Sequence, residues 1–178
     1  MKYFLQFLTI ILACSMIVAC QSPENKAQQR LIEMRKSYEK DTSKVFNKAK
    51  ASALLTAYKN FSDSFPKNDS VPEYLFQAAR IANGLTYTMD AIGCYKKVYE
   101  KYPNSKRAPF CLFMQGFIYE NNLHSPEMAK KLYEEFMKKY PNNELAKDVK
   151  FAFDNLGKSD EEIMKSIMEN KNKRRPKG

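Results

Sequence analysis

The feature that most constrains this chain is a pattern that recurs three times and ends each time in an aromatic residue followed by proline. The dipeptides are Phe65-Pro66, Tyr102-Pro103 and Tyr140-Pro141, and their prolines are 37 and 38 residues apart. Periods of this length are typical of proteins built from stacked supersecondary units, each of which buries its apolar face against its neighbours. We therefore expect a repeat protein.

The residues before each proline indicate an amphipathic helix. Apolar residues stand one, five, eight and twelve positions before the proline. These steps of four, three and four place them on one helical face, and the proline should end the helix at the aromatic residue. We expect this face to form the core. Its four columns are Phe65, Tyr102 and Tyr140; Phe61, Val98 and Phe136; Tyr58, Tyr95 and Tyr133; and Leu54, Ala91 and Ala129.

A second helix is predicted after each proline. Residues 76, 113 and 151 are all Phe, and Ala79 and Gly116 stand at a position where two helices could approach closely. In the last unit Asp154 replaces the small residue, and Lys150 replaces a leucine. A more polar final helix suits the end of a stack, whose outer face has no neighbour. The sequence thus predicts an all-α chain of helical hairpins.

These hairpins resemble the tetratricopeptide repeat. The residues that carry the resemblance are Ala79, Ala82, Ala91, Tyr95 and Tyr102-Pro103 in the middle unit, and Gly116, Tyr119, Ala129, Tyr133 and Tyr140-Pro141 in the next. The resemblance implies a short right-handed superhelix of about two and a half repeats over residues 44–158, although its period exceeds the usual 34 residues. Long, divergent repeats of this kind are similar to those of BamD-like and Tol-Pal-associated coordinator lipoproteins, which implies a role in outer-membrane assembly.

The N-terminus has the layout of a secretory signal. Lys2 precedes a mostly apolar run over residues 3–19, and Ile17-Val18-Ala19-Cys20 resembles the lipobox of bacterial lipoproteins. The resemblance implies a signal peptide over residues 1–19, acylation of Cys20, and attachment to a membrane through the acyl chains. Cys14 is the alternative lipid site, and an uncleaved anchor helix is the alternative topology. No acidic run follows Cys20, which favours the periplasmic face of the outer membrane.

The flanking segments are also predicted to be partly helical. Residues 20–43 read as a tether and an amphipathic helix that either docks on the first repeat or forms a stalk, with a break at Asp41-Thr42-Ser43. Ser159 and Glu162 fit a capping box, which begins a short helix. We expect Ile163, Met164 and Ile167 to pack across the last repeat. Residues 159–178 end in a basic tail that we expect to be disordered.

No constellation in the sequence points to catalysis. His124 is the single histidine and falls in a predicted turn, the five glycines form no phosphate-binding loop, and Glu134-Glu135 reads as solvated helix surface. We expect no enzyme activity, no cofactor and no metal site. Cys94 and Cys111 lie on apolar faces, where they form either a disulfide or two buried thiols.

The tetratricopeptide resemblance implies that the first helix of each unit lines a concave face that holds a protein or peptide partner. The candidate partner-binding residues are Glu73, Gln77, Arg80, Asn83, Phe110, Met114, Phe117 and Asn121. The alternative for the Phe and Met residues is burial against the neighbouring helix.

The formal net charge of +10 raises a second possibility. It supports a structural envelope protein that contacts lipid headgroups or glycans through its basic tail. Nucleic acid is not expected as a partner of an exported lipoprotein, and the oligomeric state is left open.

Overall fold

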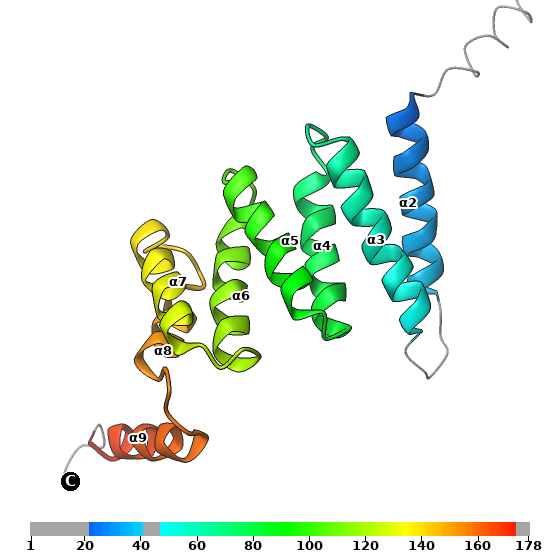
Figure 1. The fold of residues 1–178 in the computed structure, drawn as a ribbon. Coiled ribbons are helices and arrows are strands. Elements are labelled where there is room, and N and C mark those ends of the chain that lie inside the picture. The colour runs from blue at the N-terminus through cyan, green and yellow to red at the C-terminus, as the bar shows by residue number, and fades with distance from the viewer. Residues whose placement is uncertain (1–21, 41–46, 174–178) are drawn as a thin grey trace, which may run out of the picture. The chain divides into compact units, whose positions relative to one another are not determined.

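The computed structural model describes residues 22–40 and 47–173, and within these ranges every regular element is an α-helix (Figure 1). The prediction of an all-α, repeat-type fold is confirmed. The chain divides into two compact units that meet between Val71 and Pro72. The helices are α2 (Pro23–Glu39), α3 (Lys48–Ser64), α4 (Val71–Gly84), α5 (Thr88–Lys101), α6 (Ala108–Asn121), α7 (Pro126–Lys139), α8 (Ala146–Asp154) and α9 (Asp160–Lys173).

Helix α2 packs along α3 within the first unit. Its Leu31 is buried, with 2% of its surface exposed. Two side-chain hydrogen bonds hold α2 to the turn after α3: Asn68 donates to Glu24 at 2.7 Å, and Gln28 donates to Ser70 at 3.2 Å. Of the two arrangements that the sequence left open, α2 therefore adopts the docked one.

Each aromatic-proline junction ends its helix with the same geometry. Phe65, Tyr102 and Tyr140 are the C-caps of α3, α5 and α7, with φ of −130°, −130° and −129°. Each cap N–H still donates to the carbonyl four residues earlier, after which the proline prevents a further helical turn. The three turns therefore start the next helix in the same way.

Three of the four expected core columns are buried, whereas the column next to the prolines, Phe65, Tyr102 and Tyr140, is only half-buried because the chain leaves the helix there. Tyr58, Tyr95 and Tyr133 are each no more than 1% exposed. Phe76 of α4 lies against Tyr95 of α5, with ring centroids 6.2 Å apart. The equivalent pair in the next hairpin, Phe113 and Tyr133, is 6.0 Å apart. The column of aromatic residues thus serves the same packing role in successive hairpins.

Helix α8 and helix α9 end the described chain. Val149 of α8 is buried, whereas Lys150 and Asp154 form an exposed ion pair at 2.7 Å. The capping box of α9 is confirmed, because Ser159 N–H donates to Glu162 at 2.8 Å and Glu162 N–H donates to the Ser159 hydroxyl at 3.3 Å.

The packing predicted for α9 is wrong. Met164 is 51% exposed and Ile167 is 44% exposed, and Ile163 is only partly buried. In α8, Lys150 and Asp154 stand where the earlier units carry a leucine and a small residue, so the last hairpin offers less apolar surface on which α9 could bury itself.

Several predictions fall outside the described residues. They are the signal peptide, the lipid sites Cys20 and Cys14, the break over residues 41–43, and the end of the basic tail. Helix α3 begins at Lys48, where Asn47 caps it by accepting the Lys50 N–H at 3.0 Å. Cys94 and Cys111 are both buried and form no disulfide with each other, which agrees with the alternative of two buried thiols.

Candidate partner-binding surface

The candidate residues occupy equivalent positions on two first helices. Residues 73, 77 and 80 of α4 stand seven, eleven and fourteen positions after Pro66, and residues 110, 114 and 117 of α6 stand at the same distances after Pro103. Steps of four and three place each trio on one helical face. We call these six residues the α4–α6 surface: Glu73, Gln77, Arg80, Phe110, Met114 and Phe117.

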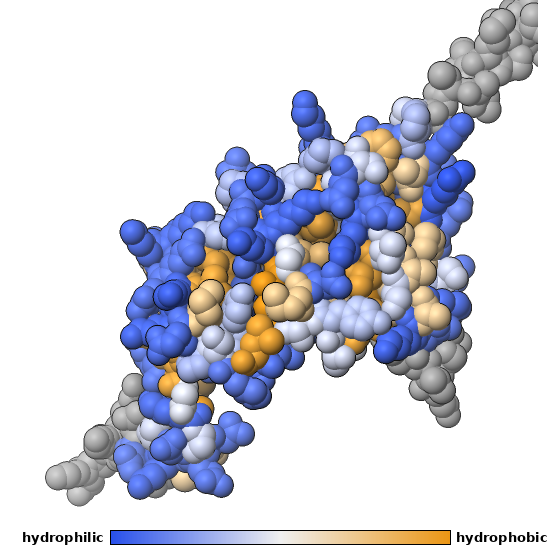
Figure 2. Space-filling model, viewed as in Figure 1, coloured by the Kyte–Doolittle hydropathy of each residue, from blue (hydrophilic) through white to orange (hydrophobic). Residues whose placement is uncertain are grey.

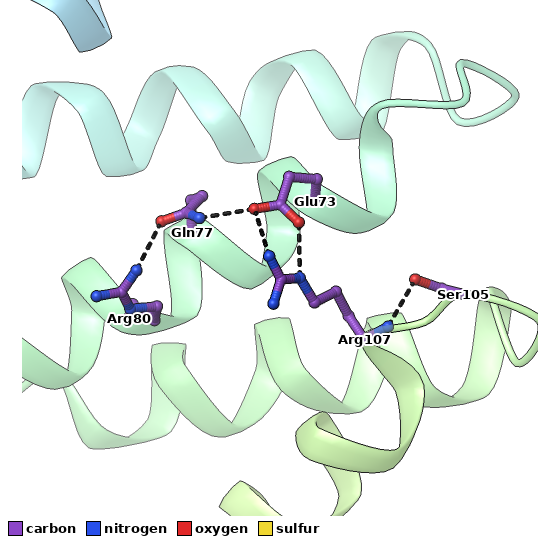
Figure 3. A network of polar contacts seen from close by, with 5 residues as sticks. All are labelled: Glu73, Gln77, Arg80, Ser105 and Arg107. Carbon is purple, nitrogen blue, oxygen red and sulfur yellow. Dashed lines mark hydrogen bonds and ion pairs between the residues drawn. The ribbon is translucent and has the colours of Figure 1, made fainter.

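A chain of polar contacts covers the α4 part of this surface (Figure 3). Arg107, immediately before α6, donates to both carboxylate oxygens of Glu73, at 2.8 and 3.3 Å. Gln77 donates to the same carboxylate at 2.7 Å and accepts a hydrogen bond from Arg80 at 3.3 Å. The side chains of α4 are thereby held in a row, and Arg107 ties that row to the start of α6.

This row of contacts contains one acidic residue, Glu73, and two arginines, Arg80 and Arg107. Partial burial acts to raise the pKa of Glu73, but hydrogen bonds from Arg107 and Gln77, together with the positive charges of Arg107 and Arg80, outweigh it and hold the pKa below its ordinary value. Glu73 is therefore ionised at neutral pH and balanced by Arg107. Arg80 is exposed and, within the described ranges, forms no ion pair. Its guanidinium lies 6.0 Å from the centroid of the Phe76 ring and interacts with Glu73 only at longer range.

Aromatic packing supports the α6 part of the surface. Phe76 lies beneath Arg107, whose guanidinium is 4.3 Å from the ring centroid, and it meets Phe110 edge-on at 5.5 Å. Phe110 and Met114 are half-buried, so the burial alternative holds in part for both. Phe117 is different, because 40% of its surface is exposed. It rests on Phe113, with ring centroids 6.2 Å apart.

The two remaining candidates, Asn83 and Asn121, contribute less to a surface that a partner could contact. Asn121 is exposed, but its side-chain amide donates to the Phe117 carbonyl at 2.9 Å near the end of α6. Asn83 is half-buried near the end of α4. We therefore keep both outside the α4–α6 surface.

Sequence reasoning missed Arg107 and Phe76 as supports of the surface. Arg107 meets Glu73 across 34 residues of sequence, and a single sequence carries no signal for such a pairing. Phe76 was visible as a repeated core position, but its contact with Arg107 depends on how the turn before α6 folds.

The described residues contain no group of three or more His, Cys, Asp or Glu side chains placed to hold a metal ion. His124 lies exposed in the turn between α6 and α7 with φ of +48°. Burial raises the pKa of the Cys111 thiol to about 12, with Glu73 adding to the effect and Arg107 opposing it. Cys111 is therefore a buried thiol and not an activated nucleophile.

None of the helices within residues 22–40 and 47–173 is both long and apolar enough to cross a membrane. Hydrophilic side chains cover most of the face shown in Figure 2, with hydrophobic areas between them. Single exposed apolar side chains are normal on a protein surface, so those that lie beside other apolar side chains are the informative ones.

Comparison with known families decides the nature of the repeat. Residues 110–143 match the tetratricopeptide repeat family. The chain contains a tetratricopeptide repeat. The match runs from Phe110 in α6 through α7 to the turn after Tyr140-Pro141, so this repeat includes the α6 half of the α4–α6 surface. The repeat indicates a scaffold for protein–protein interaction, and hence a protein partner. A search of characterised protein sequences finds no match.

Proposed function

We propose that this protein is a non-catalytic, lipid-anchored scaffold of the bacterial cell envelope that binds a protein or peptide segment across the α4–α6 surface. The observation that carries the proposal is the exposure of Phe117 on the tetratricopeptide repeat, beside an α4 face whose polar side chains are already held in place. The lipobox-like sequence before Cys20 supports the anchor.

Phe117 and Arg80 have the properties of binding hot spots. Aromatic residues and arginine are enriched among the residues that contribute most to protein interfaces. Phe117 is supported from below by Phe113, so it presents a preformed apolar contact and loses little side-chain entropy on binding. Arg80 uses one hydrogen bond to Gln77 and keeps further donors for the partner.

The proposed lipid anchor holds the α4–α6 surface close to a membrane. Two or three acyl chains hold a soluble domain on a bilayer, since each buried methylene contributes about 0.8 kcal/mol. Confinement to the membrane raises the effective concentration of membrane-bound partners. We place the protein at the periplasmic face of the outer membrane, with a role in outer-membrane assembly. The resemblance to BamD-like and Tol-Pal-associated lipoproteins supports this placement.

Crosslinking in native membranes tests the scaffold. The intact chain is crosslinked, purified through a C-terminal tag and analysed by mass spectrometry, with the double variant Arg80→Ala/Phe117→Ala beside it. Met128→Ala is the matched control, because Met128 is 38% exposed on α7, outside the surface. We expect one abundant partner with the wild type and the control but not with the double variant. Equal capture by all three chains would contradict binding at this surface.

Mass spectrometry of the purified N-terminus tests the anchor separately. We expect an acylated residue 20 at the new N-terminus, and an unprocessed, unacylated chain in Cys20→Ala. A wild-type chain that still begins at Met1 would instead support the uncleaved anchor helix, and acylation at Cys14 would move the lipid site.

A further inference from the structure

Helix α9 carries an apolar face that the other described helices leave mostly uncovered. Ile163, Met164, Ile167 and Met168 are spaced by one, three and one residues, so they share one side of the helix. Met164, Ile167 and Met168 are 51%, 44% and 58% exposed. Three large apolar side chains within five residues are therefore open to solvent.

The rest of α9 makes it an amphipathic helix whose apolar face is mostly exposed. Glu162, Lys165 and Glu169 lie on the side opposite the apolar face, at steps of three and four. The capping box formed by Ser159 and Glu162 satisfies the first turn. Asp160, Glu161 and Glu162 also place negative charge at the positive end of the helix dipole. The end of the helix nearest α8 is thus stabilised locally.

A dense basic sequence follows the apolar face directly. Residues 171–177 contain five cations and no acid, namely Lys171, Lys173, Arg174, Arg175 and Lys177. An apolar helix face combined with a cluster of lysine and arginine is the combination that binds anionic membrane surfaces. Neither part suffices alone, because a few apolar side chains give only weak, reversible attachment.

We propose that α9 docks in the plane of an anionic lipid surface. Ile163, Met164, Ile167 and Met168 enter the boundary between headgroups and acyl chains, and the positive charge that the sequence carries over residues 171–177 adds attraction to the lipid phosphates. This attachment is additional to the proposed N-terminal anchor and involves the opposite end of the chain. It gives the repeat domain two points of contact with a bilayer.

The size of the face favours a membrane over a second copy of this chain. The apolar residues span six positions, about 9 Å of helix. A stable protein interface needs roughly 800 Å² from each partner, far more than four side chains on two helical turns provide. A lipid surface has no such minimum, because each cation near anionic headgroups strengthens binding by about fivefold.

The absence of tryptophan from the chain permits a direct test. In Met168→Trp, the new indole is the only tryptophan and reports the surroundings of α9. The full chain is reconstituted into vesicles of equal parts phosphatidylcholine and phosphatidylglycerol, with brominated acyl chains as quenchers. The control is Met89→Trp on α5, where the native side chain is 67% exposed. We expect a blue shift and quenching at position 168 and neither at position 89.

The second arm of the test removes charge from either the chain or the lipid. Changing the five cations to glutamine, or using phosphatidylcholine alone, should lower quenching at position 168 several-fold. No quenching at 168, or equal quenching at 168 and 89, overturns the proposal. A blue shift that grows with protein concentration but needs no vesicles also overturns it, because a second copy then covers the face. The assay contains only the chain and lipid, so its result is independent of partner binding at the α4–α6 surface.

Discussion

Gly116 sets the closest approach between two helices of the matched repeat. A Cβ atom built at this position would lie 2.5 and 2.8 Å from two ring carbons of Tyr133. Tyr133 is fully buried, and its hydroxyl donates to Glu120 at 2.7 Å. The ring is held at its far end and cannot move aside, so only glycine fits between α6 and α7.

Gly116→Ala should therefore destabilise the protein. Alanine is the better helix former by about 1 kcal/mol, but overpacking a tight core usually costs about 1–3 kcal/mol. We expect a net loss of stability in urea unfolding. Gly93→Ala is the control, because Gly93 lies on α5 with no atom within 4 Å of its added Cβ. That variant should be slightly stabilised. Equal effects of the two changes would refute the steric role of Gly116.

Ion pairing at Glu73 gives a dependence on pH. Its lowered pKa means that folding favours the ionised form, so its contribution to stability is present above pH 4.5 and is lost as the pH falls further. Glu73→Gln should lower the free energy of unfolding at pH 7 by about 0.5–1 kcal/mol, because the pair is largely exposed. The difference from the wild type should shrink below pH 4.5.

Urea unfolding of the wild type and of Glu73→Gln at several pH values measures this difference in the free energy of unfolding. Glu100→Gln is the control, since Glu100 pairs with Lys96 on the same helix at 3.5 Å and links no second helix. A difference between wild type and Glu73→Gln that stays constant from pH 7 to pH 3 would show that the ion pair with Arg107 does not stabilise the fold.

At the scale of the element, the turns after each proline repeat one hydrogen-bonding scheme. The carbonyls of Phe65, Tyr102 and Tyr140 accept from the N–H three residues later, at 3.0, 2.9 and 3.1 Å. A side-chain oxygen of Asn68, Ser105 or Asn143 then accepts from the N–H two residues further on. Proline, followed after one residue by a short polar side chain, is the local signal for this turn.

The capping box at the N-terminus of α9 stabilises a helix that has little packing against the others. In Ser159→Ala the capping box is broken, and the first turn of the helix should fray because no packing replaces it. We expect hydrogen exchange at the Ile163 N–H, which bonds to the Ser159 carbonyl, to become several-fold faster. Ser22→Ala, which removes the cap of α2, is the control. Unchanged exchange at Ile163 in Ser159→Ala would show that contacts other than the cap hold α9.

Periodic features of the sequence were sufficient to predict most helices and the aromatic core. Each column before a proline reflects local helical spacing, which a single sequence contains. The contacts that depend on distant residues were missed. Glu135 is exposed, as predicted, but it also accepts a hydrogen bond from Tyr99 of α5, and Lys139 donates to the Tyr99 hydroxyl at 3.0 Å. The packing of α9 was predicted wrongly because an apolar stripe indicates a buried face without identifying what buries it.

At the scale of the whole molecule, different parts of the chain have different roles. The buried tyrosine columns and Gly116 fix the hairpins, and the Glu73–Arg107 pair joins successive first helices. In our proposals, the α4–α6 surface binds a protein partner and the two ends of the chain bind the membrane. For the candidate partner-binding residues, the spacing in the sequence places each trio on one helical face, but it does not predict which side chains are exposed, because exposure depends on contacts between side chains of α4 and α6 such as that of Phe76 with Phe110.

Site-specific photocrosslinking from residue 117 tests the central claim most directly. A photoreactive phenylalanine replaces Phe117 in one chain and Met128 in another, since the native side chains are 40% and 38% exposed. Both chains are irradiated in native membranes and analysed by mass spectrometry. We predict one abundant protein adduct from position 117 and none from position 128. No adduct at 117, or the same adducts from both positions, would contradict partner binding at the α4–α6 surface.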